Sequence, residues 1–310
     1  MRLQNPYPRA LGRRAGSALL RLAVYVLLID LSFVFVYPFL YMLSTSLKSY
    51  EDLHNLLVGW IPTSLHWENY KLAAEAMALK STVLHSVTVT ALATAGHLIS
   101  CAFIGYGFAR FEFPFKKLLF FGVILSAVLP IQVMIVPLYI VYYNMGMLNT
   151  FLPLILPAFL GFGLRGGIFI YLFRQFFYGF PATLEEAARI DGCGRIRSFF
   201  AIALPSAGPT IIVTTVLSMV WHWNDYYEPS VYLTNGSKTA LVTQMLPNLY
   251  ENLSGMMTQT GNVSQLEWMT MYHEGVVMAA TAIAIAPLLV AYALLQKKFM
   301  ASIELTGLVG

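Results

Sequence analysis

Long runs of apolar residues, separated by short polar segments, dominate the chain from Leu22 onward. A bilayer core needs about 20 apolar residues per helix, and backbone polar groups in lipid must be satisfied within the helix. The 47 residues between Lys117 and Arg165 carry no charge, which is too long for one span and fits two, broken at Asn144–Asn149. The pattern predicts an all-α integral membrane protein with six transmembrane helices, at about Leu22–Leu47, Val83–Ala109, Leu118–Val141, Leu152–Phe173, Ser206–Trp223 and Gly275–Gln296.

Composition supports this assignment. Of the 310 residues, 58% are hydrophobic and only 11% are charged, whereas soluble domains carry about a quarter charged residues. An ordinary soluble enzyme and a disordered chain are therefore excluded. The net charge of +4 is too small to indicate a nucleic-acid partner. Cys101 and Cys193 form no CxxC spacing, so neither a disulfide framework nor a thiolate metal site is expected.

The distribution of basic residues predicts the topology. Of 19 Lys and Arg, all but five lie in the N-terminal tail, after the second and fourth spans, or after the sixth. The positive-inside rule then places both termini in the cytoplasm. The expected organisation is a cytoplasmic tail (1–21), a six-helix transmembrane domain (22–297) and a second cytoplasmic tail (298–310). Arg13-Arg14 resembles a twin-arginine signal, but the apolar run that follows is too long and no cleavage site is seen, so no cleavage is expected.

The most specific cytoplasmic feature is the loop at about 174–205. Thr183 to Glu186 fits a capping box, in which the hydroxyl accepts from the backbone three residues on and the carboxylate reaches back. Asp191-Gly192 would end this helix. A second helical stretch would follow and end at Leu204-Pro205. The small residues on the first helix permit close approach by another protein, although a connector lying on the surface would look the same.

Another loop, at about 228–274, lies on the outside in this topology. It is long for an otherwise economical chain, which favours function. A solvated connector and a surface for an extracytoplasmic partner are both compatible with its sequence.

Polar and aromatic side chains in or near the spans are candidates for a translocation pathway, because buried polar groups in membranes face protein or water. Arg165 could donate hydrogen bonds into a cavity or pair with a neighbouring helix. The aromatic cluster near Trp221 could stack a sugar ring or form an interfacial belt. His85 and His97 are too far apart to share a metal and are expected to pack. The candidates are Gln132, Arg165, Trp221, Trp223, Asn224 and Asp225.

The cytoplasmic loop resembles a known family. Glu186 to Cys193, followed by Ile202 to Pro205, is similar to the EAA loop of ABC importer permeases. The surrounding residues are similar to carbohydrate-uptake permeases of the MalG type. These segments are Pro38–Lys48, Glu68–Tyr70, Gly146–Thr150, Arg174–Phe177, Trp223–Asp225 and Ser302–Gly310. Two departures are Gly194, where the family more often has a larger residue, and the charge at Arg165.

This resemblance implies a type I ABC importer permease fold and a coupling helix that docks on a cytoplasmic ATPase. Glu186 would cap and orient that helix, Ala187 and Ala188 would allow tight seating, and Gly192 would form the sharp turn. The implied coupling residues are Thr183, Glu186, Ala187, Ala188, Asp191, Gly192, Leu204 and Pro205. The implied location is a bacterial inner membrane.

The resemblance also implies the assembly. The partners would be a second homologous permease, which forms a heterodimer with this chain, two ABC ATPase subunits and an extracytoplasmic solute-binding protein. ATP and Mg would be held by the ATPase subunits, with no cofactor or metal on this chain. The sequence has no intact P-loop and no HExxH motif, so a transport subunit is expected rather than an enzyme.

The expected substrate is a sugar or an oligosaccharide. One alternative is an ABC permease for another solute, such as a glycerol-phosphate ester or a polyamine. A phosphorylated solute would require more cationic groups than Arg165. A proton-coupled secondary transporter would have to rely on Asp30 and Asp225, and a membrane enzyme would need a catalytic constellation that is not visible.

Overall fold

The computed structural model describes residues 8–163, 165–234, 236–260 and 271–307, and within these ranges every regular element is helical. This confirms the all-helical fold class. The chain divides into two compact units, which are described separately. Unit 1 comprises residues 1–72 and 264–282, and unit 2 comprises residues 73–263 and 283–310.

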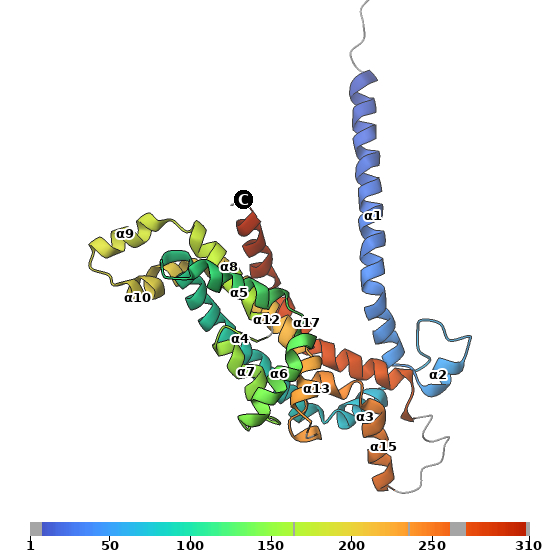
Figure 1. The fold of residues 1–310 in the computed structure, drawn as a ribbon. Coiled ribbons are helices and arrows are strands. Elements are labelled where there is room, and N and C mark those ends of the chain that lie inside the picture. The colour runs from blue at the N-terminus through green and yellow to red at the C-terminus, as the bar shows by residue number, and fades with distance from the viewer. Residues whose placement is uncertain (1–7, 164, 235, 261–270, 308–310) are drawn as a thin grey trace, which may run out of the picture. The chain divides into compact units, whose positions relative to one another are not determined.

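Unit 1 is built around the long helix α1, drawn in blue in Figure 1. Asn69 is fully buried and fixes the turn that follows α1, because its Nδ2 donates to the carbonyls of Ser46 at 2.9 Å and Lys48 at 2.8 Å. A side-chain amide thereby satisfies carbonyls that the end of a helix leaves unpaired. The helices with residues in this unit are α1 (Pro8–Ser46), α2 (Tyr50–His54), α3 (Glu68–Ala76) and α17 (Glu274–Gly307), of which α3 and α17 also contribute to unit 2.

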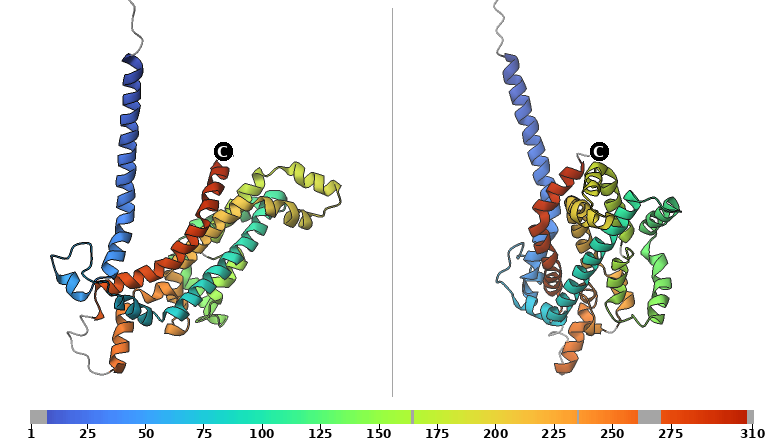
Figure 2. Two further views of the ribbon diagram at one scale, coloured as in Figure 1. Left: turned by 180° about the vertical axis from the view of Figure 1, so that it is seen from behind. Right: turned by 90° about the vertical axis from the view of Figure 1, so that its left-hand side faces the viewer.

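Unit 2 is organised around α4, which packs against α7, α8 and α12. Figure 2 shows these helices running alongside one another. The helices of this unit are α4 (Leu79–Arg110), α5 (Lys116–Val128), α6 (Ile131–Asn144), α7 (Leu152–Phe159), α8 (Gly166–Gly179), α9 (Ala182–Ile190), α10 (Arg195–Ser198), the π-helical turn η1 (Phe199–Ala203), α11 (Leu204–Ser206), α12 (Gly208–Asn224), α13 (Tyr227–Tyr232), the 3₁₀ turn η2 (Gly236–Lys238), α14 (Val242–Met245) and α15 (Leu249–Thr260).

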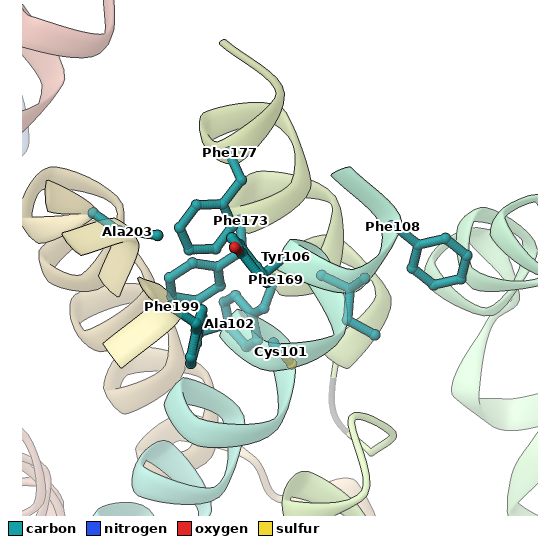
Figure 3. Close-up of a cluster of buried hydrophobic side chains, with 11 residues drawn as sticks. Cys101, Ala102, Tyr106, Phe108, Phe169, Phe173, Phe177, Phe199 and Ala203 are labelled. Carbon is teal, nitrogen blue, oxygen red and sulfur yellow. The ribbon is translucent and has the colours of Figure 1, made fainter. Parts of the chain in front are cut away.

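Helices α4 and α8 approach each other closely at Gly105. A Cβ on this residue would lie 2.7 Å from Phe173 Cβ and 2.8 Å from the backbone nitrogen of Arg174. No side chain fits in that space, so the glycine lets the two backbones meet. Around this contact, Figure 3 shows a buried aromatic cluster to which α4 contributes Tyr106, α8 contributes Phe173 and Phe177, and η1 contributes Phe199.

Among the described residues, three helices are long and apolar enough to cross a membrane: Leu20–Ser46, Leu79–Arg110 and Glu274–Ser302. They coincide with the expected first, second and sixth spans. Two further pairs of helices pass the same test together but are bent, Lys116–Val128 with Ile131–Asn144 by 104° and Arg195–Ser206 with Gly208–Asn224 by 74°. The described residues therefore contain three continuous candidate spans, or up to five if each bent pair is one span.

The expected third span, Leu118–Val141, is wrong as a continuous helix. It breaks between α5 and α6, where Leu129 is extended (φ −62°, ψ 127°) and Pro130 precedes the first residue of α6. Proline lacks a backbone donor and disfavours helical geometry in the residue before it. The break therefore follows from Leu129-Pro130.

The expected fourth span, Leu152–Phe173, is also interrupted. Helix α7 ends at Phe159 and α8 begins at Gly166. Between them Gly161 (φ 71°), Gly163 (φ 92°) and Arg165 (φ 60°) adopt left-handed backbone geometry, which a right-handed helix cannot include.

Side chains of α4 support this interruption. Ser100 Oγ donates to the Ala158 carbonyl at 2.6 Å, and Cys101 Sγ to the Gly166 carbonyl at 3.7 Å. His97 Nε2 lies 3.3 Å from the Phe162 carbonyl. Broken helices at membrane depth are tolerated where neighbouring protein groups satisfy the freed backbone. Consecutive turns of α4 supply those groups here.

The fifth expected span, Ser206–Trp223, begins slightly late. Pro205 lies in the first turn of α11 instead of ending the preceding helix, and η1 joins α10 to α11. The chain bends only at Ala207, after which Pro209 opens α12. Proline is accommodated in a first helical turn, where its missing donor is not needed.

The α4–α8 contact gives a direct test. Gly105→Val places a branched side chain against the α8 backbone, and overpacking of this kind destabilises by about 1–3 kcal/mol or more. We expect a lower melting temperature for the detergent-solubilised protein, measured by light scattering during heating.

The matched control is Gly107→Val, on the same helix, where a Cβ would meet nothing within 4 Å. Both variants replace a glycine of α4 by valine, so the change in intrinsic helix propensity is the same. Equal melting temperatures for the two variants would contradict the close approach at Gly105.

Candidate functional site

The helix of the loop at 174–205, α9, begins two residues earlier than a capping box at Thr183 requires. Pro181 is the N-cap residue, and no side chain caps the helix. Thr183 is therefore inside the first turn, where its hydroxyl cannot serve as an N-cap acceptor. The expected capping box is wrong, and Glu186 does not cap. It is exposed and lies 3.8 Å from Arg189 on the same helix.

The neighbouring acid, Glu185, fixes α9 to α4. Its carboxylate is buried, accepting from Arg110 Nε at 2.9 Å and from the Tyr106 hydroxyl at 3.0 Å. Arg110 Nη2 also donates to the Phe180 carbonyl at 2.6 Å, just before α9. Paired charges that also hydrogen bond are stable when buried, but removing one partner leaves the other uncompensated. This network holds α9 against the end of α4, and the sequence analysis did not identify it.

The other faces of α9 have few partners in this chain. Leu184 is 50% exposed and Ile190 is 87% exposed, and Thr183, Glu186 and Ala187 are also exposed. Ala188 is half-buried. Figure 1 shows α9 at one end of unit 2. A short helix with exposed aliphatic and small side chains is suited to a groove on another protein.

The end of α9 matches the sequence expectation. The helix ends at Ile190 and Gly192 adopts φ 80°. The Gly192 nitrogen donates to Arg189 at 3.1 Å and the Cys193 nitrogen donates to Ala188 at 2.8 Å. Glycine is favoured at such a helix end because left-handed geometry strains other residues. Asp191 and Gly192 are both exposed.

After this turn, α10 and η1 return the chain to the core. Phe199 and Ala203 are buried in the aromatic cluster of Figure 3, beside Tyr106 and Phe177. Leu204 packs against the same cluster, whereas Pro205 is exposed. Both ends of the loop are therefore packed against α4 and α8.

A second feature is a cavity of about 290 Å³ at the bend between α5 and α6. Gln132 and Arg165, two of the candidate pathway residues, both line it, together with Tyr142, Phe162 and Glu228. Glu228 is only 7% exposed, and within the part of the chain that the structure describes its Oε1 has no hydrogen-bond partner. Burial, together with the nearby Asp225 carboxyl, raises the pKa of Glu228 to about 8.

The other pathway candidates lie outside this lining. Trp221 stacks under the Arg165 guanidinium at 4.8 Å, so it supports the cavity wall indirectly. Trp223 is buried and donates from Nε1 to the Ala284 carbonyl at 3.0 Å, which ties α12 to α17. Asn224 is exposed and its Nδ2 donates to the Val220 carbonyl.

Asp225 shapes the turn between α12 and α13. Its Oδ1 accepts from the backbone nitrogens of Tyr227 at 3.1 Å and Glu228 at 3.4 Å. Burial raises the pKa of Asp225 to about 6, although these backbone donors oppose the shift. Asp225 therefore positions the start of α13, the helix that carries Glu228.

A buried polar cluster between α4 and α12 was not anticipated either. His97 Nδ1 lies 3.3 Å from Ser218 Oγ and 3.4 Å from His222 Nε2. This agrees with the expectation that His97 packs. In the described part of the chain, no group of three or more His, Cys, Asp or Glu side chains is arranged to hold a metal ion.

Long apolar helices that cross a membrane, with a polar loop beyond their ends, define a multi-pass membrane protein. A family model described as "Binding-protein-dependent transport system inner membrane component" matches residues 101–304. The chain belongs to this family of inner-membrane transport components, and it is a permease subunit of an ABC transporter. This membership confirms the expectation of a transport subunit and not an enzyme.

Individual relatives agree. The chain is 30% identical to the probable ABC transporter permease protein YurM of Bacillus subtilis, over 91% of this chain and 86% of that protein. It is also 30% identical to the diacetylchitobiose uptake system permease protein NgcG of Streptomyces coelicolor, over 95% and 91% of the two chains. Among solved structures, a chain of a bacterial ABC transporter involved in import of the acidic polysaccharide alginate matches with a TM-score of 0.73, at 20% identity over 96% of this chain and 100% of that one. This last likeness shows the fold.

Removing the partner of Glu185 should detach α9. In Arg110→Met the carboxylate stays buried without its cation, a change that costs about 3–5 kcal/mol in buried pairs. We expect faster trypsin cleavage within the α9–α10 loop, measured by mass spectrometry of fragments from the solubilised protein.

The control is Lys116→Met, which removes the cation of the Lys116–Glu112 pair, whose Glu112 side chain is 90% exposed. Exposed pairs contribute about 0–1 kcal/mol. If loop cleavage in Arg110→Met equals that in Lys116→Met, then Glu185 does not anchor α9.

Proposed function

We propose that this chain is one of two permease subunits in an ABC importer for a sugar or an oligosaccharide, which an extracytoplasmic solute-binding protein delivers. Carbohydrate uptake is supported by relatives whose names specify it, such as the diacetylchitobiose permease. One structural observation carries the assignment. Helix α9 is fixed to α4 by Glu185 and Arg110 while its other faces stay exposed.

In this proposal α9 is the coupling helix. It would seat in a groove of an ATPase subunit, with Ala187 at the contact and Leu184 and Ile190 providing apolar area. Glu186 does not cap the helix, so its exposed carboxylate would be available to contact the ATPase subunit. ATP and Mg are bound by two ATPase subunits, not by this chain.

Six spans follow if α7 and α8 together make one broken span. The spans would be α1, α4, α5 with α6, α7 with α8, α10 to α12, and α17. Both termini then lie in the cytoplasm, as the basic residues favour. The loop at 228–274 would face the outside and contact the binding protein.

Transport by such a subunit requires two states of the membrane domain. A second, homologous permease would complete the pathway, and closure of the ATPase pair would move α9. Because Glu185 and Arg110 connect α9 to α4, a displacement of α9 would be passed to the helix that contacts α7, α8 and α12.

The deciding experiment is ATP hydrolysis by the reconstituted complex, with its partner subunits and binding protein. The binding protein is loaded in turn with maltose, cellobiose, N,N′-diacetylchitobiose, spermidine and glycerol 3-phosphate. Stimulation by one of the sugars supports the proposal. Stimulation only by spermidine or glycerol 3-phosphate would assign a different solute class, and solute uptake that follows a proton gradient without ATP would refute it.

Gly192→Val tests the coupling helix. Valine at φ 80° is strained by about 1–3 kcal/mol. Relief of this strain would change the backbone angles at residue 192 and so the direction of the chain after α9. We expect substrate-stimulated ATP hydrolysis to fall several-fold in complexes that still assemble, as judged by subunit ratios after purification.

The matched control is Gly194→Val. Gly194 has φ −66° and ψ 160°, which valine adopts readily, and open space surrounds both glycines. Undiminished stimulation in an assembled Gly192→Val complex would argue against α9 as the coupling element.

A further inference from the structure

The buried carboxyl of Glu228 lines the cavity at the α5–α6 bend. Glu228 is buried, and its Oε1 has no hydrogen-bond partner among the described residues. A buried polar atom without a partner destabilises the fold, because its desolvation is not compensated. Such a group in a native structure is explained by strain, by function or by a bound molecule.

The position of Glu228 is set by its neighbours. Asp225 caps the first turn of α13 through the backbone nitrogen of Glu228. The Tyr142 and Tyr232 rings pack edge-to-face at 5.1 Å, joining α6 to α13. These contacts fix the start of α13 and pack α13 against α6. Glu228 is therefore carried by a positioned helix at the cavity wall.

The cavity lining also includes a cationic side chain. Arg165 lines it, makes no ion pair with another described residue, and places its guanidinium over the Trp221 ring. Gln132 adds an amide, and Tyr142 and Phe162 add aromatic surface. A volume of about 290 Å³ is close to the lower limit, roughly 300 Å³, of cavities that hold small ligands.

These groups together favour an uncharged polyhydroxyl ring over a charged solute. An organic cation would meet Arg165, and a phosphate ester would find a single cationic side chain, Arg165, among the described lining residues. A sugar hydroxyl both donates and accepts, so it can satisfy an acid and a guanidinium at once. Because the pKa of Glu228 is about 8, its acid form predominates at pH 7 and both donates and accepts as well.

We propose that this cavity is a sugar-binding subsite within the permease subunit, in which Glu228 hydrogen bonds a hydroxyl of one sugar ring and Arg165 and Gln132 contact its other polar groups. This inference rests on the proposed function and adds a specificity-determining residue, Glu228. Glu228 lies at the start of the loop at 228–274, beyond the end of the expected fifth span.

The test uses the complete complex in lipid nanodiscs, without the binding protein, and the labelled sugars maltose, cellobiose and N,N′-diacetylchitobiose. Equilibrium dialysis gives the dissociation constant of the complex for the sugar that it imports. Loss of one hydrogen bond to a buried carboxyl predicts a rise of about tenfold for Glu228→Leu. Glu228→Gln, which keeps a donor and an acceptor without charge, should stay within about twofold of the parent.

Two further variants make the result decisive. Glu112→Gln neutralises an acid that is 90% exposed and absent from the cavity lining, and it should bind as the parent does. Gln132→Leu changes an exposed cavity residue, so folding is not at stake, and it should weaken binding in the same direction as Glu228→Leu. If Glu228→Leu fails to assemble, Gln132→Leu decides.

The outcomes separate the two proposals. If proteoliposomes with loaded binding protein import none of these sugars, the proposed function fails. If they import a sugar but the parent complex does not bind it, or if Glu228→Leu and Gln132→Leu bind it as tightly as the parent, the subsite is refuted and the function stands. Equal loss in Glu228→Gln and Glu228→Leu would also refute it, because recognition would then depend on charge.

Discussion

The contact between α4 and α8 at Gly105 is the constraint on which unit 2 depends. With no side chain between them, the two backbones lie close enough for the aromatic cluster to close around Tyr106, Phe173 and Phe177. That cluster also receives Phe199 from the returning loop. The packing that holds α4 and α8 together therefore also fixes the base of the loop at 174–205.

Helix α4 connects the regions that the proposed mechanism requires. Near its end, Arg110 binds Glu185 and positions α9. Between three and four turns earlier, His97 contacts the interrupted segment between α7 and α8, which leads to Arg165 and the cavity. A rigid element that touches both places is the physical requirement for coupling between two sites. The buried ion pair and the close helix contact would make α4 move with α9 instead of bending away from it.

Local signals in the sequence were reliable where one residue type decides the geometry. Gly192 ends α9 as expected because left-handed backbone at a helix end selects glycine. The break at Leu129-Pro130 had the same kind of signal, but the uninterrupted apolar run concealed it. Glu185 and Glu186 could not be told apart, because adjacent residues face about 100° apart on a helix and Pro181, as the N-cap residue, moves the start two positions from the one expected at Thr183. The family was evident from the loop motif. The pairing of His97 with Ser218, and the placement of Glu228 beside Gln132, depend on long-range packing that no local pattern contains.

The supports of the interruption between α7 and α8 limit how this protein can diverge. Ser100, Cys101 and His97 each contact a carbonyl in or beside the segment that Gly161 and Gly163 leave non-helical. If a glycine were replaced first, the segment would be strained. If a polar residue of α4 were replaced first, a carbonyl would lose its partner at membrane depth. Substitutions on the two elements are therefore epistatic: either order passes through a less stable intermediate, so lineages should retain or exchange these positions as a set.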